Sequence, residues 1–224
     1  MSFTAKLTVI NQPIGLLGGT FDPVHTAHLR LAEEALRQLG LAEVLWIPAG
    51  QPHHRAAPLA APEHRLAMVS LATAGHPRFR VDDAEILNAT PGYTVPMLER
   101  LRRDLGDRRP LVLLMGADAF LMLTGWHRWR ELFRLAHIGI ASRPTFPLTP
   151  AAMPAELAEE FQRRHGPPAA LTQTAAGVIV DFPLSAGTVS ATEVRAKLRQ
   201  GTAADTLLPA PVLDYIHRHH LYSN

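Results

Sequence analysis

The chain has 224 residues, of which 47% are hydrophobic and 19% charged, so it can form one full α/β domain and is not a disordered chain. Its formal net charge is only +2 and no Lys/Arg-rich run occurs, which gives no indication of a nucleic-acid partner. The absence of cysteine excludes disulfide bonds, zinc–thiolate sites and thiol nucleophiles.

Strand and helix patterns alternate from the first apolar run onward. Residues 14–17 are a short apolar run, and Gly18 and Gly19 after it predict a buried strand that ends in a tight turn. Apolar side chains at helical spacing follow, and Gly40 marks the end of that helix. Residues 44–47 predict the next strand.

Residues 48–62 are rich in proline, alanine and histidine without periodicity, which predicts a loop, and loops of this length are often functional. The pattern beyond it predicts strands at residues 79–81, 111–115, 136–141 and 178–181, and helices at residues 62–74, 94–105, 150–166, 191–198 and 209–220. Strands that alternate with helices predict βαβ units on a parallel sheet. The predicted fold is therefore α/β, a doubly wound parallel sheet in a single domain over residues 1–224, with a helical C-terminal part at about 185–224.

The segment GGTFDPVHTAH, residues 18–28, lies between a predicted strand and a predicted helix. Ligands of open α/β sheets bind at the carboxyl ends of strands, and the free N–H groups of a helix start suit phosphate. His25 and His28 are three residues apart, so they can project to one side and donate hydrogen bonds to phosphate, with added charge if protonated. The alternative is a glycine turn with two surface histidines. A zinc pair would lack an obvious third ligand, and the Gly-x-Gly-x-x-Gly and P-loop motifs are absent.

The segment VSATEVRAKL, near the C-terminus, begins a second helix of interest. Ser190 and Glu193 form a capping-box pattern, so one explanation is that Ser190 merely caps the helix. The same helix start presents Ser190, Thr192 and Arg195, whose hydroxyls and guanidinium suit a polyphosphate. The two explanations are compatible.

Together these segments resemble the two signatures of the nucleotidylyltransferase superfamily, Gly-Gly-Ser/Thr-Phe-Asp-Pro-x-His-x-Gly-His and Ser-Ser/Ala-Thr-x-x-Arg. The segments IPAGQPHHR, PGYTVPML, GADAFLMLTGWHRW, ASRP and LLPAPVLDYIHRHHLY resemble elements of the bacterial nicotinate-nucleotide adenylyltransferase family, so the resemblance covers nearly the whole chain. It implies a Rossmann-like fold and transfer of AMP from ATP to nicotinate mononucleotide, which gives deamido-NAD and pyrophosphate in NAD biosynthesis. Mg²⁺ would come with ATP, held mainly by phosphates and water and not by a protein metal site.

The resemblance also assigns residues to the two substrates. ATP would be bound by Gly18, Gly19, Thr20, Phe21, His25, His28, Ser190, Thr192 and Arg195. The mononucleotide would be bound by His54, Arg55, Tyr93, Thr94, Asp118, Trp126 and Arg143. Within the first set, His25, His28 and Arg195 would be catalytic, since they would stabilise charge on the reacting phosphates.

Most of the acceptor residues also have a purely structural explanation. His54 and Arg55 could form a solvated basic loop, or close over the acceptor phosphate. Thr94 and Asp118 could be helix caps, although amides beside Thr94 could also receive the nicotinate carboxylate. Trp126 could belong to a core or an interface, or stack on the pyridine ring.

The sequence departs from the family pattern at a few positions. These are Ala27 between the two histidines, Ala49-Gly50 where some relatives carry Asn, Pro91-Gly92 before Tyr93, and His127 after Trp126. The last three lie on the mononucleotide side.

Two other functions stay open at this point. The chain could be a related transferase that acts on nicotinamide mononucleotide, phosphopantetheine or a sugar phosphate, or it could be a non-catalytic nucleotide sensor. The N-terminus lacks a signal-peptide core and no run reaches the ~18 apolar residues of a membrane span, so we expect a cytoplasmic protein without a membrane or nucleic-acid partner. Monomer and dimer are both compatible with the sequence.

Overall fold

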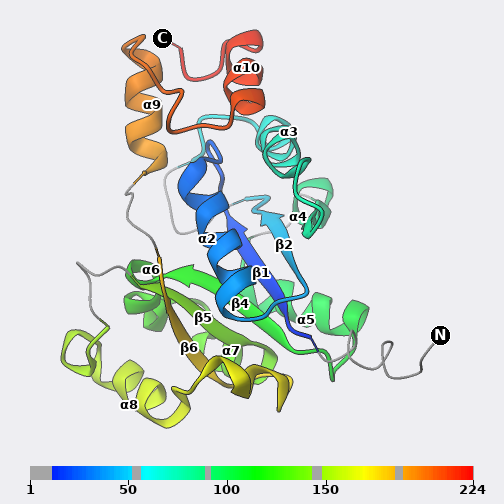
Figure 1. Ribbon diagram of the computed structural model, residues 1–224, viewed down its shortest axis with the longest axis vertical. Helices are drawn as coiled ribbons and strands as arrows, with labels where there is room; N and C mark the ends of the chain where they lie inside the picture. The colour runs from blue at the N-terminus through cyan, green and yellow to red at the C-terminus, as the bar shows by residue number, and fades with distance from the viewer. Residues whose placement is uncertain (1–11, 52–56, 89–91, 143–147, 185–188, 224) are drawn as a thin grey trace. The chain divides into compact units, whose positions relative to one another are not determined.

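The computed structural model describes residues 12–51, 57–88, 92–142, 148–184 and 189–223 (Figure 1). The chain divides into two compact units. The first comprises Met1–Leu17, Ala32–Val44 and Tyr93–Ser185, and the second comprises Gly18–Leu31, Leu45–Gly92 and Ala186–Asn224. The single domain over residues 1–224, with its C-terminal part from about residue 185, stays a prediction.

Six strands form one sheet in the order β3-β2-β1-β4-β5-β6. Their bounds are Ile14–Gly19 for β1, Glu43–Pro48 for β2, Phe79–Val81 for β3, Leu111–Gly116 for β4, His137–Ser142 for β5 and Ile179–Pro183 for β6. Strand β4 pairs in parallel with β1 and β5, and β5 pairs in parallel with β6. This strand order is that of a doubly wound Rossmann-type sheet, so the predicted fold class is confirmed.

The longer helices lie close to the predicted ranges. They are α2 at Thr26–Gln38, α3 at Pro62–Thr73, α5 at Thr94–Leu105, α8 at Ala155–Arg164, α9 at Ala191–Arg199 and α10 at Ala210–Arg218. The sequence did not predict the short helices α4 at Ala84–Leu87, α6 at Ala117–Leu121 and α7 at Leu132–Leu135, or the 3₁₀ turns at Leu123–Gly125, Trp129–Glu131 and Pro168–Thr172. The helix predicted at residues 150–166 is divided into a 3₁₀ turn at Pro150–Ala152 and α8. Elements of three to five residues are too short to show a helical period.

Two expected boundaries are wrong. Gly18 and Gly19 do not end the first strand but are its last two residues. Thr94 is not the cap of α5: the N-cap position belongs to Tyr93, whose side chain makes no capping hydrogen bond, and Thr94 is the first helical residue. The first-turn amides of α5 are therefore not capped by their own N-cap side chain.

The core of the first unit is built from continuous apolar strands, as expected for a parallel sheet that is covered on both faces. Val112 lies opposite His137, and Ile138 lies opposite Ile179. Buried Arg102 connects separate segments of this unit, because its guanidinium donates hydrogen bonds to their main-chain carbonyls. The acceptors are the carbonyls of Leu135 at 2.7 Å, Arg109 at 2.6 Å and Ala175 at 2.8 Å.

In the second unit, α3 packs against α10 (Figure 1). The Tyr215 hydroxyl on α10 lies 2.9 Å from Nδ1 of His64 on α3. The start of α2 is fixed as well, because the Thr26 amide donates to the Leu207 carbonyl at 2.9 Å. The C-terminal residues are thereby joined to the helix that follows the glycine-rich segment.

Candidate active site

The glycine-rich segment leaves β1 with its backbone accessible. Gly18 is exposed, and Gly19 and Thr20 are half-buried. A Cβ atom at Gly19 would lie 3.0 Å from the ring of Phe21, so a side chain at this position would displace that ring. Phe21 adopts a left-handed φ of 51° and is buried, with its ring edge-to-face on His28 at a centroid distance of 5.0 Å.

His25 and His28 lie together, with stacked rings whose centroids are 3.8 Å apart. His25 is 5% exposed, and this burial lowers its pKa to about 4. At neutral pH it is therefore an uncharged hydrogen-bonding ring and not the cation that the sequence allowed. Its Nδ1 is buried and has no hydrogen-bond partner among the described residues.

The backbone selects the tautomer of His28. The His25 amide donates to Nδ1 of His28 at 3.2 Å. A neutral imidazole that accepts at Nδ1 carries its proton on Nε2, so His28 presents Nε2–H as a donor. Both histidines thus suit donation to phosphate oxygens without a metal ion.

Helix α9 brings the second predicted motif to the first. Ser190 caps the helix as expected, because its Oγ accepts from the Glu193 amide at 3.2 Å. The Arg195 guanidinium donates through Nη1 to the Asp22 carbonyl at 2.6 Å, and Nη2 lies 3.5 Å from the Thr192 hydroxyl. The two motifs are therefore in direct contact, through Arg195 of the second and the Asp22 carbonyl of the first.

A buried arginine that the sequence did not single out holds the same region. Arg65, on α3, is fully buried and donates through Nη1 to the carbonyls of Thr20 at 2.8 Å and Ala49 at 2.7 Å. Its Nη2 donates to the Gly50 carbonyl at 3.0 Å. The ends of β1 and β2 are thus tied to one side chain. Burial lowers the pKa of Arg65, and the nearby charge of Asp22 opposes that shift.

The acceptor residues that the structure describes belong to the first unit. Tyr93 and Thr94 stand at the start of α5, and the Tyr93 ring contacts His127 at a centroid distance of 4.9 Å. Trp126, next to His127, is half-buried rather than a core residue. In the first turn of α5 the amides of Thr94 and Val95 are potential donors.

Asp118 follows the carboxyl end of β4, in the first turn of α6, and is exposed. It does not occupy the N-cap position, which belongs to Gly116. The Asp118 carboxylate folds back over that glycine, since a Cβ atom there would lie 2.5 Å from Oδ1. Glycine at position 116 therefore sets where this carboxylate lies. His54, Arg55, Arg143 and Pro91 lie outside the described residues.

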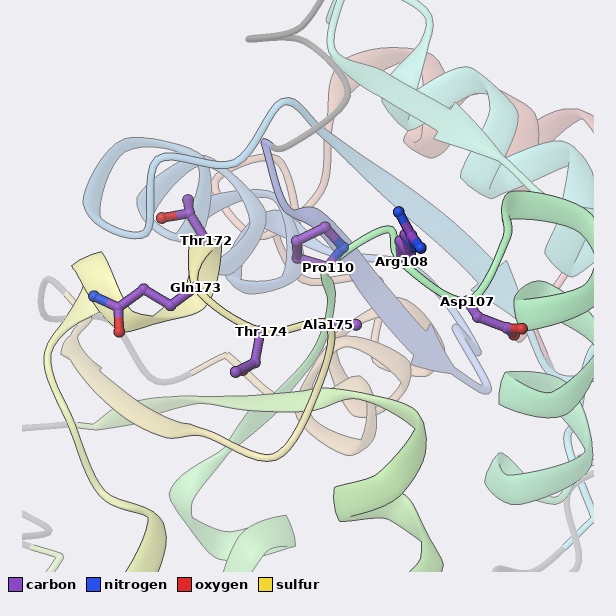
Figure 2. Close-up of a pocket in the computed structure, with 7 residues that line it drawn as sticks. All are labelled: Asp107, Arg108, Pro110, Thr172, Gln173, Thr174 and Ala175. Atoms are coloured by element: carbon purple, nitrogen blue, oxygen red, sulfur yellow. The ribbon is translucent and has the colours of Figure 1, made fainter.

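A surface hollow of about 300 Å³ lies elsewhere in the first unit (Figure 2). Its lining residues are Asp107, Arg108, Pro110 and Thr172, Gln173, Thr174 and Ala175. Pro110 immediately precedes β4, so the hollow is at the amino end of that strand. Nucleotides bind at the carboxyl ends of such strands, and the hollow is therefore not the predicted nucleotide site.

The sequence also matches known proteins over most of its length. The family model described as cytidylyltransferase-like matches residues 16–197. A protein of Dechloromonas aromatica (strain RCB) named "Probable nicotinate-nucleotide adenylyltransferase" is 51% identical over 216 residues, which are 96% of this chain and 100% of the relative. One of the same name from Chromobacterium violaceum is 45% identical over 95% of this chain and 100% of that protein. The chain belongs to the nicotinate-nucleotide adenylyltransferase family.

Comparison with solved structures gives the same fold. The structure of Plasmodium falciparum nicotinic acid mononucleotide adenylyltransferase complexed with NaAD matches with a TM-score of 0.71 and 15% identity, over 94% of this chain and 97% of that one. At this identity the likeness concerns the fold alone. The family resemblance drawn from the two motifs is confirmed by the two relatives, which match 96% and 95% of this chain.

The family motifs contain residues whose roles the sequence did not reveal. Asp22 and Tyr222 lie within segments that resemble the family, yet neither had a predicted function. Their contact spans 200 positions of sequence, and Arg65 donates hydrogen bonds to three carbonyls in two other segments. No local spacing encodes such contacts, so only an alignment or a structure could have indicated them.

The described residues contain no cluster of three or more His, Asp or Glu side chains that could hold a metal ion. In the same part of the chain, no helix is long and apolar enough to cross a membrane. The Asp22 carboxylate already accepts three hydrogen bonds of 3.0 Å or less, which leaves it poorly suited as a metal ligand.

Proposed function

We propose that this chain transfers the adenylyl group of ATP to nicotinate mononucleotide, forming deamido-NAD and pyrophosphate. The observation that carries the proposal is the contact between the two motifs, in which His25 and His28 stack and Arg195 donates to the Asp22 carbonyl. It occurs in a chain whose relatives, matched over their whole length, are named for this reaction. Imidazole and guanidinium donors from two motifs that meet beyond the end of β1 suit a polyphosphate.

The reaction needs no protein nucleophile. An oxygen of the acceptor 5′-phosphate attacks the α-phosphorus of ATP in line, a new P–O bond forms, and the bond to the bridging oxygen breaks as pyrophosphate leaves. Catalysis then consists of positioning and charge stabilisation. Neutral His25 and the Nε2–H of His28 would donate hydrogen bonds to the phosphate oxygens, while Arg195 would supply positive charge.

Mg²⁺ would enter with ATP as part of the substrate. The saturated carboxylate of Asp22 fits this arrangement, because the ion would be held by phosphate oxygens and water. When bound with ATP, the ion would neutralise the charge that develops on the leaving pyrophosphate. The lack of cysteine fits a cytoplasmic reaction.

For the acceptor, the start of α5 is the part that distinguishes a carboxylate from an amide. The N–H groups of Thr94 and Val95 and the positive end of the helix dipole favour an anion, whereas Pro96 has no N–H to offer. Trp126, which is half-buried, would provide a stacking face for the pyridine ring. The proposed set is completed, as the resemblance implies, by His54, Arg55, Tyr93, Asp118 and Arg143.

The test is pyrophosphate release with ATP and either nicotinate or nicotinamide mononucleotide at one pH. Replacing a charge-assisted contact by a neutral one loses ~1–3 kcal/mol, or about 5- to 150-fold in kcat/KM. We expect a preference of at least about tenfold for the nicotinate form. Equal values, or a preference for the amide, would overturn the acceptor assignment, and binding of ATP without turnover on either acceptor would indicate a sensor.

A further inference from the structure

Asp22 joins three distant segments of the second unit. Its buried carboxylate accepts through Oδ1 from the Tyr222 hydroxyl at 2.7 Å and from the Ala60 amide at 3.0 Å. Through Oδ2 it accepts from the Leu59 amide at 2.8 Å. The Nη1 atom of Arg195 lies 3.9 Å from the same Oδ2 while it donates to the Asp22 carbonyl.

The backbone conformation of the C-terminal residues places the Tyr222 hydroxyl against the Asp22 carboxylate. Helix α10 ends at Arg218, and His220 and Tyr222 then adopt left-handed φ values of 50° and 61°. Non-glycine residues hold this conformation only where surrounding contacts impose it. Tyr222 is 8% exposed, and burial and its bond to Asp22 raise the pKa of the phenol, so the hydroxyl stays a proton donor.

The charge of Asp22 stands next to the residue that we expect to bind ATP. Arg65, a second cation of this region, is committed to main-chain carbonyls through both Nη atoms. The Arg195 side chain retains 21% exposure, so its guanidinium is accessible to a ligand. If the Asp22 carboxylate accepted fewer hydrogen bonds, it would attract the Arg195 guanidinium more strongly and would compete with a triphosphate for that guanidinium.

We propose that Tyr222 is a positioning residue for ATP: its hydroxyl donates a hydrogen bond to the Asp22 carboxylate, so that the Arg195 guanidinium stays available to bind the triphosphate. This inference rests on the proposed function of Arg195 in ATP binding. It makes the end of the chain part of the nucleotide site, although Tyr222 itself touches neither substrate in this scheme.

Tyr222→Phe removes the hydroxyl and keeps the ring, and Tyr215→Phe is the matched control. Tyr215 belongs to the same C-terminal segment, and its hydroxyl contacts His64 instead of Asp22. The measurements are the Kd of ATP by calorimetry without acceptor, the KM of each substrate, and the Tm. We expect Tyr222→Phe to weaken ATP binding about 5- to 10-fold, with the KM of the mononucleotide within about 2-fold, and Tyr215→Phe to leave both within about 2-fold.

Arg195→Lys, alone and combined with Tyr222→Phe, shows whether the tyrosine acts through the arginine. If it does, Tyr222→Phe weakens ATP binding by a smaller factor when Arg195 is already replaced. An equal factor in both backgrounds, or an effect no larger than that of Tyr215→Phe, overturns the positioning role and leaves the proposed function intact. Unchanged ATP binding and turnover in Arg195→Lys overturns the positioning role together with the role of Arg195 in ATP binding, whereas absence of turnover in the wild type overturns the proposed function, so the failures are distinct.

Discussion

The buried histidine of the nucleotide segment should make the protein sensitive to acid. His25 has a pKa of about 4 in the folded chain, whereas the unfolded chain restores its ordinary value of 6.5. Between these values the unfolded chain binds more protons, so stability rises with pH and falls as the medium is acidified. His25→Gln removes this titrating group while keeping a hydrogen-bonding side chain.

The size of the effect follows from the two pKa values. Through His25 alone, wild type should lose about 2 kcal/mol of unfolding free energy between pH 7 and pH 5, and about 3 kcal/mol in all below pH 4. Burial also lowers the pKa of His137, which adds to the slope of both proteins. The informative quantity is therefore the difference in free energy of unfolding between wild type and His25→Gln at each pH.

Urea unfolding, followed by circular dichroism at pH 7, 6 and 5, measures that difference. His217→Gln removes an exposed histidine of α10 and controls for the loss of one imidazole. We expect the stability gap between wild type and His25→Gln to change by about 2 kcal/mol over this range, and that of the control to stay nearly constant. Parallel losses in wild type and His25→Gln would refute the conclusion that folding keeps His25 uncharged.

Three other substitutions test separate parts of the structure. His28→Ala should lower kcat by about 10²-fold, the scale of losing a preorganised donor to the reacting phosphates, and near-normal kcat in a folded variant would contradict its role. Ser190→Ala should cost about 1 kcal/mol in urea unfolding by removing the cap on the Glu193 amide, and an unchanged midpoint would show that this cap contributes nothing. Arg102→Lys should lower the free energy of unfolding by about 2–4 kcal/mol, because one ammonium cannot reach three separated carbonyls. A loss below about 1 kcal/mol would show that these hydrogen bonds contribute little to stability.

Local patterns in the sequence predicted the fold class, which the structure confirms, and the candidate nucleotide residues, which stay a prediction. Continuous apolar runs predicted the strands, since a parallel sheet is buried on both faces. Ser190 and Glu193 predicted a cap that the structure contains, because a capping box is encoded within four residues. The two motifs predicted the family, which the relatives confirm.

The tertiary structure decided what depends on burial and on contacts between distant residues. Spacing suggested a pair of histidines that could carry charge, but burial makes His25 neutral at pH 7. Asp22, Arg65 and Tyr222 could not be assigned from the sequence, since their partners lie in other segments. Periodicity records which face of an element is apolar, whereas desolvation and hydrogen bonds across 173 or 200 residues arise only when the chain is folded.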